Sequence, residues 1–313
     1  MYDNFTLCLQ AVLPVFIYMA IGMGIRKVNL LNDREVRKFN HLIFVIFFPV
    51  LMFHNLYGHH LEEIVNGHLA VFGISIVLGI YFLSIPIILK IEKSQASRGA
   101  MIQAIYRSNF IIMGLPVAMS IVGDQKAPVT MMMVAIIVPL YNIMAVITLE
   151  IFRGGRPKLS RILLRILMNP LILGAIAGII AAITALHLPA ALEGIIDDMA
   201  GITSPLAVMI LGASFDFQAV AAKKRDVAIC VFGRLVAVPA IGLSLAALLG
   251  FRNVEFITLL AMLAAPTAVS SFTMAESMGS DGKLAGACVV FSSAFSVFTM
   301  FLWLFLFKNL GMF

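Results

Sequence analysis

Two stretches decide the fold: RSNFIIMGLP at residues 107–116 and LAAPTAVSS at residues 263–271. Each places a proline, with small or hydroxyl-bearing neighbours, inside an otherwise apolar run. Proline inside a helix removes a backbone donor and clashes with the preceding turn. In lipid, such freed backbone groups are tolerated only where they face protein or a cavity. We therefore expect a broken helix at each stretch, at Gly114-Leu-Pro116 and at Pro266; a kink repaired by neighbouring helices is the alternative.

The composition around these stretches is that of a membrane protein. Hydrophobic residues make up 61% of the 313 residues and charged residues only 12%, with a mean hydropathy of +1.03. Soluble proteins carry about 25% charged residues, so this chain cannot cover a water-facing surface, which excludes an ordinary soluble enzyme and a disordered chain. The net charge of +6 is not gathered with aromatics on one basic face, so nucleic acid is not an expected partner.

Apolar runs of about 20 residues can each cross a bilayer as a helix, and polar residues divide the chain into ten of them. The first five predicted spans are 6–25, 39–57, 69–89, 100–122 and 127–152. The second five are 170–187, 202–217, 227–250, 254–277 and 284–307. The fold class predicted is an all-α polytopic membrane protein.

Lysine and arginine are unevenly shared between alternate connecting segments. The segments taken alternately from the one after span 1 hold seventeen of them, whereas the opposite set holds Lys126, Arg252 and Lys308. Positively charged loops stay on the cytoplasmic side. We therefore expect a multi-pass protein of the cytoplasmic membrane with both termini outside.

A basic linker at residues 153–168 separates two groups of five spans, residues 1–152 and residues 169–313. An odd number of spans per group makes the second group enter the membrane from the opposite side, which is the inverted repeat common among secondary transporters. Helix breakers recur in spans that hold the same place in each half. The second span of each half carries Pro49 or Pro205, and the fourth carries Gly114-Leu-Pro116 or Pro266. Interrupted helices at matching places in two halves indicate a transport site.

Motifs along the whole chain resemble the auxin efflux carrier family in its shorter bacterial form. They are Leu13-Pro14 with Gly22 and Gly24, Asp33 followed by Phe39-Asn40 and Phe48-Pro49, Arg107-Ser-Asn109 with Gly114-Leu-Pro116, and Leu263-Ala-Ala-Pro266-Thr with Ala275-Glu276. The resemblance implies a fold shared with bile-acid sodium symporters. In that fold, broken helices 4 and 9 cross in a transport domain (helices 3–5 and 8–10) that moves against a panel domain (helices 1, 2, 6 and 7). It also implies that Asn109 contacts the substrate, that Pro116 and Pro266 mark the crossing, and that the substrate is a small carboxylate such as malonate or malate.

The expected substrate site gathers polar residues and broken backbone from spans 4, 5 and 9. Its members are Asn109, Gly114, Pro116, Pro266, Thr267, Ser270 and Ser271, joined by Arg107 and Asn142. Half-helix N-termini carry partial positive charge and suit an anion, and Arg107 is close enough to Asn109 to attract one. Tyr141 and Asn142 either face the same cavity or bond a neighbouring helix. For Arg107 and Arg234, the alternative is that each side chain snorkels to the cytoplasmic interface.

No carboxylate falls in the middle of a predicted span, which argues against a cationic substrate and against a carboxylate proton relay. We expect a secondary transporter that moves a small organic anion by elevator-like alternating access, with the direction left open. No cofactor is expected; a coupling sodium ion held by neutral oxygens and uniport both stay open. The alternatives are a sodium-coupled symporter of the bile-acid symporter type and, in a different class, a membrane sensor that does not transport.

Neither an enzyme nor a metal site is expected. The chain has no His-Glu-x-x-His, Gly-x-Ser-x-Gly, Walker or dinucleotide signature. His41, His54, His59, His60 and His68 lie at interfaces or in a loop without a spacing that converges on a metal. The expected partners are a small organic anion and the lipid bilayer, and assembly as a homodimer stays open.

Overall fold

The computed structural model describes residues 2–57, 67–123, 127–153, 159–184 and 186–313, and the regular elements within them are helices. Six helices in these ranges are long and apolar enough to cross a membrane: Asp33–His54, Gly67–Ile91, Pro128–Ile151, Ala190–Ser214, Lys224–Leu248 and Gly282–Asn309. Phe110–Val122, Pro170–Ile183 and Asn253–Ala264 are shorter apolar helices. The prediction of an all-α, polytopic membrane protein is confirmed.

The elements of the first half follow the predicted spans in order. They are α1 (Tyr2–Lys27), α2 (Asp33–Leu42), η1 (Ile43–Phe47), α3 (Phe48–His54), α4 (Gly67–Ile91), α5 (Gln95–Tyr106), η2 (Phe110–Gly114), α6 (Leu115–Val122) and α7 (Ala127–Ile151). Stretch 33–54 is a continuous helix with a π-helical turn inside it, and stretch 110–122 is a continuous helix that begins with a π-helical turn.

The second half contains α8 (Leu159–Leu167), α9 (Pro170–Ile183), α10 (Ala190–Ser214), α11 (Phe217–Ala222), α12 (Lys224–Phe232), η4 (Gly233–Ala237), α13 (Val238–Leu248), α14 (Asn253–Ala264), α15 (Ser270–Ser277) and α16 (Gly282–Asn309). One boundary was predicted wrongly: α10 begins at Ala190, twelve residues before the predicted span 202–217. Acidic residues near its start suggested a loop. Two of them face partners across the helix pair instead, since Glu193 accepts from the Tyr57 hydroxyl at 2.6 Å and Asp197 pairs with His54 at 3.1 Å.

Three π-helical turns of the described chain each end two residues before a proline, at Pro49, Pro116 and Pro239. In each case the residue just before the proline donates its N–H five residues back, as Leu115 does to the Phe110 carbonyl. A proline ring clashes with the carbonyl four residues earlier, and the wider π turn moves that carbonyl aside. These prolines therefore lie within continuous helices and do not end them.

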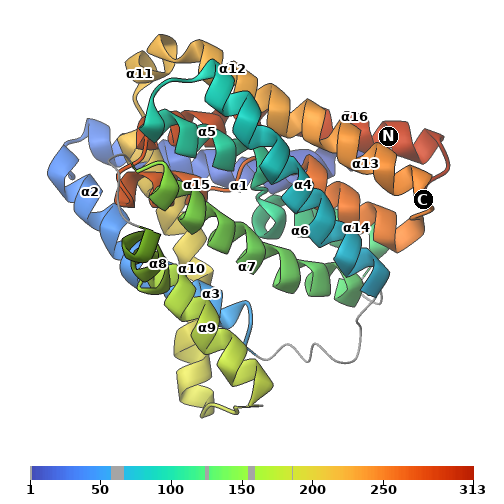
Figure 1. The fold of residues 1–313 in the computed structure, drawn as a ribbon, viewed down its shortest axis with the longest axis horizontal. Coiled ribbons are helices and arrows are strands. Elements are labelled where there is room, and N and C mark those ends of the chain that lie inside the picture. The colour runs from blue at the N-terminus through green and yellow to red at the C-terminus, as the bar shows by residue number, and fades with distance from the viewer. Residues whose placement is uncertain (1, 58–66, 124–126, 154–158, 185) are drawn as a thin grey trace.

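The helices form two packed groups. α1 packs on α10, α10 on α3 and α3 on α9, and these four helices share one hydrophobic core with parts of α2, α7, α15 and α16. α9 and α10 project at the lower left of Figure 1. The other core is built by α4 to α7, α12 to α14 and α16. In the first group the backbones touch: a Cβ atom on Gly22 of α1 would lie 1.9 Å from the Met209 carbonyl oxygen of α10. Small residues that let backbones meet are the usual basis of helix association in membranes.

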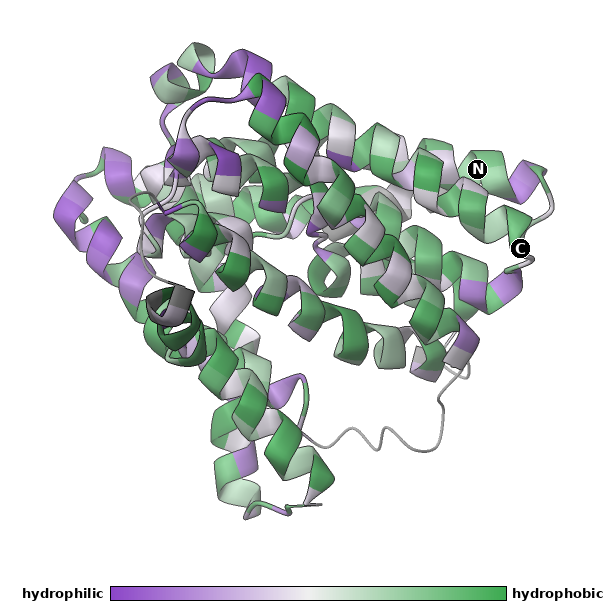
Figure 2. Cartoon of the chain, viewed as in Figure 1, coloured by the Kyte–Doolittle hydropathy of each residue, from purple (hydrophilic) through white to green (hydrophobic). Residues whose placement is uncertain are grey.

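Polar residues gather at one end of the molecule, where the connections after α4, α10 and α15 meet (Figure 2). Asp281, the N-cap of α16, accepts from the Ser97 hydroxyl at 2.8 Å and pairs with Lys223. Lys283 donates to Asp216 at 2.8 Å. Three of the segments that the sequence assigns to the basic side are therefore neighbours in space, as an alternating path through a bilayer requires.

Candidate functional site

The two breaks exist and touch each other. α5 ends at Tyr106 before η2 begins at Phe110, and α14 ends at Ala264 before α15 begins at Ser270. Between them, Ser108 and Thr267 form an isolated antiparallel bridge. The Asn109 N–H donates to the Pro266 carbonyl at 2.7 Å. These unwound residues, 107–109 and 265–269, form what we call the crossover, and each segment satisfies part of the other's buried backbone.

The second break follows the prediction and the first does not. Ala265, just before Pro266, is extended at φ −63° and ψ 148°, which is the conformation that a following proline favours. In the first half, the break lies at residues 107–109, so its predicted position at Gly114-Leu-Pro116 is wrong. Gly114 and Pro116 lie in continuous helix, and a Cβ atom on Gly114 would be 2.5 Å from the Ala261 carbonyl oxygen of α14. Gly114 therefore allows helix contact.

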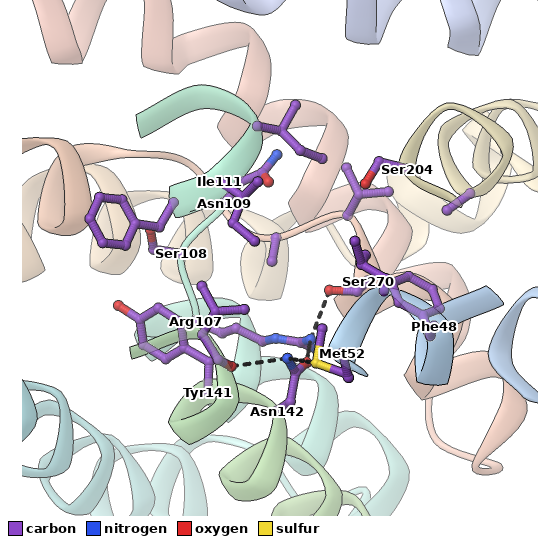
Figure 3. A pocket seen from close by; sticks show the side chains of 17 residues that line it. Phe48, Met52, Arg107, Ser108, Asn109, Ile111, Tyr141, Asn142, Ser204 and Ser270 are labelled. Carbon is purple, nitrogen blue, oxygen red and sulfur yellow. Dashed lines mark hydrogen bonds between the residues drawn. The ribbon is translucent and has the colours of Figure 1, made fainter. Parts of the chain in front are cut away.

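A cavity of about 60 Å³ lies between the crossover and helices α3, α7 and α10 (Figure 3). Four predicted site residues line it: Arg107, Asn109, Asn142 and Ser270. Tyr141, expected beside Asn142, lines it as well. Sequence reasoning missed Ser108, which adjoins Asn109, and Ser204, which precedes the noted Pro205; it also missed the apolar wall formed by Phe48 and Met52 of α3.

Arg107 is the charged group of this cavity. Its side chain is 2% exposed and runs toward Asn142 and Ser270 in Figure 3. It donates to the Asn142 amide oxygen and, at 2.7 Å, to the Ser270 hydroxyl. Among the described residues no carboxylate pairs with it. The snorkelling interpretation is therefore wrong for Arg107, and a buried cation is left with neutral partners only.

The cavity also contains polar atoms that have no partner in the structure. The Asn109 amide nitrogen is buried and unpaired. The Ser108 and Tyr141 hydroxyls are also buried, and they lie close enough to bond each other. Residues 110–112 and 268–270, where η2 and α15 begin, line the same space, and the first amides of a helix have no acceptor within it. Unpaired buried donors are costly, so their concentration here indicates a space made for a polar ligand.

The remaining predicted residues support the crossover instead of lining the cavity. The Thr267 hydroxyl donates to the Ala104 carbonyl at 2.9 Å, and its N–H donates to Ser292 at 3.1 Å. The Ser271 carbonyl accepts from Gln103 at 2.9 Å. Gly114, Pro116, Pro266, Thr267 and Ser271 are all absent from the lining. They hold the backbone that positions Arg107 and Asn109.

Arg234, on η4, lies on the other side of the crossover. It is fully buried, and its guanidinium donates to the carbonyls of Ile105, Tyr106, Met262, Leu263 and Ala265. Those carbonyls end α5 and α14. The snorkelling interpretation is therefore wrong for Arg234 as well.

The histidines do not form a metal centre within the described residues, where no group of three or more His, Cys, Asp or Glu is placed to hold an ion. His54 pairs with Asp197, and His68 stacks on Phe251 with ring centroids 4.6 Å apart. His59 and His60 lie outside the described residues.

Apolar helices that unwind around a buried polar cavity are characteristic of multi-pass membrane transport proteins. The sequence profile of the membrane transport protein family matches residues 7–304. The chain belongs to this family, the auxin efflux carrier family, as its motifs suggested. This is a transport family and not an enzyme family. A comparison with curated proteins gives no match.

Proposed function

We propose that this protein is a secondary transporter that carries a small organic anion, a carboxylate, through the crossover by alternating access. One observation carries the proposal: Arg107 is buried at the cavity without a carboxylate among the described residues. A buried charge is strongly destabilising unless it is paired, and ionisable groups inside membrane proteins mark substrate pathways. An anionic ligand supplies the missing partner.

The helix ends add to the positive potential of the cavity. Each helix N-terminus is equivalent to about half a positive charge, and η2 and α15 both begin at the cavity. Together with Arg107 they supply about two positive charges. We therefore expect dicarboxylates to bind more tightly than monocarboxylates of similar size, and neutral amides of the same shape to bind weakly.

Helix contacts support a 5+5 inverted repeat of ten spans. When each helix of the first half is matched to the helix five spans later, α1 matches α9 and α3 matches α10. The contact between α1 and α10 then matches the contact between α9 and α3, and both contacts are present. The pairs α4 with α5 and α13 with α14 correspond in the same way, as do α6 with α7 and α15 with α16. The crossover joins the two broken spans to each other. In this proposal both termini lie on the outer side of the cytoplasmic membrane.

The cavity also supports an elevator-like movement. At about 60 Å³ it has room for little more than a few water molecules, so a carboxylate needs it to widen. One wall belongs to α3 and α10, of the first packed group, and the other to the crossover. Sliding of the crossover and its supporting helices past α1, α3, α9 and α10 opens this space without unfolding either group.

The test is counterflow in proteoliposomes with radiolabelled mono- and dicarboxylates, imposed voltages, and neutral amide analogues as competitors. We expect carboxylates to exchange and the amides not to compete. Arg107→Ala should lower exchange by about tenfold or more, because a charge-assisted bond to the anion is lost. Arg252→Ala is the matched control, because Arg252 is an exposed arginine at the start of α14 that donates to the Ala247 carbonyl of α13. Binding of carboxylates without any counterflow would instead identify a sensor.

A further inference from the structure

Arg234 uses all its N–H donors on backbone carbonyls, and the Tyr141 hydroxyl lies beside it. A guanidinium has five N–H donors, and in Arg234 they meet five carbonyl oxygens: Nε reaches Ala265 at 2.8 Å, Nη1 reaches Ile105 and Tyr106 at 3.1 and 3.0 Å, and Nη2 reaches Met262 at 3.1 Å and Leu263. Among the described residues no carboxylate pairs with it. Its counter-charge is the backbone.

Those carbonyls come from the two helix ends that the crossover creates. α5 ends at Tyr106 and α14 ends at Ala264, and the last carbonyls of a helix lack partners within it. Each helix C-terminus is equivalent to about half a negative charge, so two of them balance one guanidinium. In transporters with broken helices, such C-terminal ends and unwound carbonyls are where a coupling sodium ion or proton binds.

We propose that Arg234 is the built-in cation of the crossover and fills the place that a coupling metal cation would need. Anion transport by this protein is then independent of sodium. The statement about transport rests on the function proposed above, whereas the binding of a positive charge by the five carbonyls does not. Removing the guanidinium leaves a cage of carbonyl oxygens that attracts a soluble cation.

The first experiment compares wild-type counterflow in sodium and in choline media at equal ionic strength. The proposal predicts rates that agree within about twofold; a drop of about tenfold or more without sodium would overturn it. If no carboxylate is exchanged in either medium, the function proposed above fails, and the stability measurements that follow still test the role of Arg234.

The second experiment separates charge from packing with two variants of similar length, Arg234→Lys and Arg234→Met. A lysine can place its ammonium among some of the same carbonyls, so Arg234→Lys should keep counterflow within about tenfold of wild type, whereas Arg234→Met should abolish it. Equal losses in the two variants would show that Arg234 only fills space and would overturn the proposal.

The third experiment adds guanidinium to Arg234→Ala to replace the missing side-chain cation, and it uses thermal melting in detergent as the readout. Millimolar guanidinium should raise the melting temperature of this variant by several degrees and leave wild type unchanged, with urea as the uncharged control. Arg252→Ala, which removes another arginine bonded to carbonyls at a helix end, should show no such rise. If guanidinium raised the melting temperatures of Arg234→Ala and Arg252→Ala equally, or if urea had the same effect as guanidinium, the five carbonyls would not be a cation site and the proposal would be overturned. Should Arg234→Ala not fold, the comparison of Arg234→Lys with Arg234→Met decides.

Discussion

Asn109 and Asn142 are both buried at the cavity, yet they differ in what they bond. The Asn109 amide nitrogen has no partner, whereas Asn142 accepts from Arg107 and donates to the Val138 carbonyl at 2.9 Å. A side chain whose donor is unpaired contributes little to stability in the empty protein. Asn109 is therefore available to a ligand, and Asn142 is part of the frame.

Asn109→Ala should accordingly reduce carboxylate counterflow by about tenfold while leaving the melting temperature within about 2 °C of wild type, since an unpaired buried donor is removed. Asn142→Ala is the contrast. This change removes the Asn142 acceptor of the Arg107 guanidinium. It should therefore lower transport and also reduce the free energy of unfolding by about 1–3 kcal/mol. Wild-type flux in Asn109→Ala, in vesicles with equal protein content, would remove Asn109 from the site.

At the residue scale, sequence reasoning found the polar groups better than their roles. Arg107, Asn109, Asn142 and Ser270 were predicted and line the cavity, because polar side chains are rare in apolar spans. The role of Arg234 was not predictable: its five partners are main-chain carbonyls from residues 105 to 265, and carbonyls carry no sequence signal. Residues of α3 and α10 were missed because most of that wall is apolar.

Helices α1 and α10 depend on two glycines for their contact. A Cβ atom on Gly22 would lie 1.9 Å from the Met209 carbonyl oxygen, and one on Gly212 would lie 2.1 Å from that of Met19. Backbone cannot move aside as a flexible side chain can. Gly24, two residues further along α1, is exposed, and a Cβ atom built on it would have nothing within 4 Å.

Gly22→Ala should therefore destabilise the protein by about 1–3 kcal/mol, the usual cost of overpacking, and lower the melting temperature in detergent by several degrees. Gly24→Ala should leave it unchanged or slightly higher, because alanine favours helix over glycine. Similar melting temperatures for the two variants would show that the backbones of α1 and α10 are not in contact.

The N-cap of α16 gives a pH prediction. Burial tends to raise the pKa of Asp281, but hydrogen bonds from Lys223, the Leu284 N–H and Ser97 outweigh it and lower the pKa below the ordinary 3.8. A depressed carboxyl pKa stabilises the fold above 3.8, and this contribution is lost as the pH falls through the folded-state value.

Asp281→Asn should thus melt earlier than wild type at pH 7, and the gap should narrow as the pH falls below 3.8. Melting curves in detergent across this range provide the measurement, with Asp33→Asn, at the exposed start of α2, as the comparison. A gap that stays constant down to low pH would mean that the Asp281 charge does not stabilise α16.

At the element scale, the prolines marked a real break only once, at Pro266. Pro266 ends α14 because the preceding residue is pushed out of helical geometry. Pro116 does not end its helix, since the π turn η2 absorbs the clash. The actual break at 107–109 contains no glycine or proline. It is stabilised by backbone pairing with residues 266–268, a tertiary contact 160 residues away that local sequence does not show.

The first packed group contacts the crossover elements along α2, which continues into α3, and α15, as well as at the cavity. Asn40 of α2 donates to the Ser277 hydroxyl of α15 at 3.0 Å. Within the first packed group, Tyr57 donates to Glu193 at 2.6 Å and joins the end of α3 to α10. These two contacts distinguish relative movement of the groups from movement inside one of them.

Cysteine cross-linking turns this difference into a measurement. In a chain without native cysteines, Asn40→Cys with Ser277→Cys, joined by a short bifunctional reagent, should abolish counterflow. Joining Tyr57→Cys with Glu193→Cys should leave counterflow largely intact. Full transport through the first cross-link would rule out sliding between the groups, and reduction of a cleavable linker should restore activity in the locked variant.

At the scale of the whole molecule, composition and the charge of alternate loops were enough to predict a polytopic helical protein. They could not predict how the helices pack, because lipid-facing and buried surfaces are equally apolar: Leu69 is fully buried and Phe82 is 64% exposed within the same helix. The division into two groups comes from contacts such as Gly22 with Met209, which only coordinates reveal.

The most direct test of the account is to see where the anion binds. The protein in nanodiscs, saturated with a carboxylate that it exchanges, is imaged by electron microscopy at a resolution that shows side chains. We predict carboxylate density about 3 Å from the Arg107 guanidinium and the Asn109 amide, between the first turns of η2 and α15. A carboxylate bound elsewhere, with the crossover cavity empty, would contradict the account.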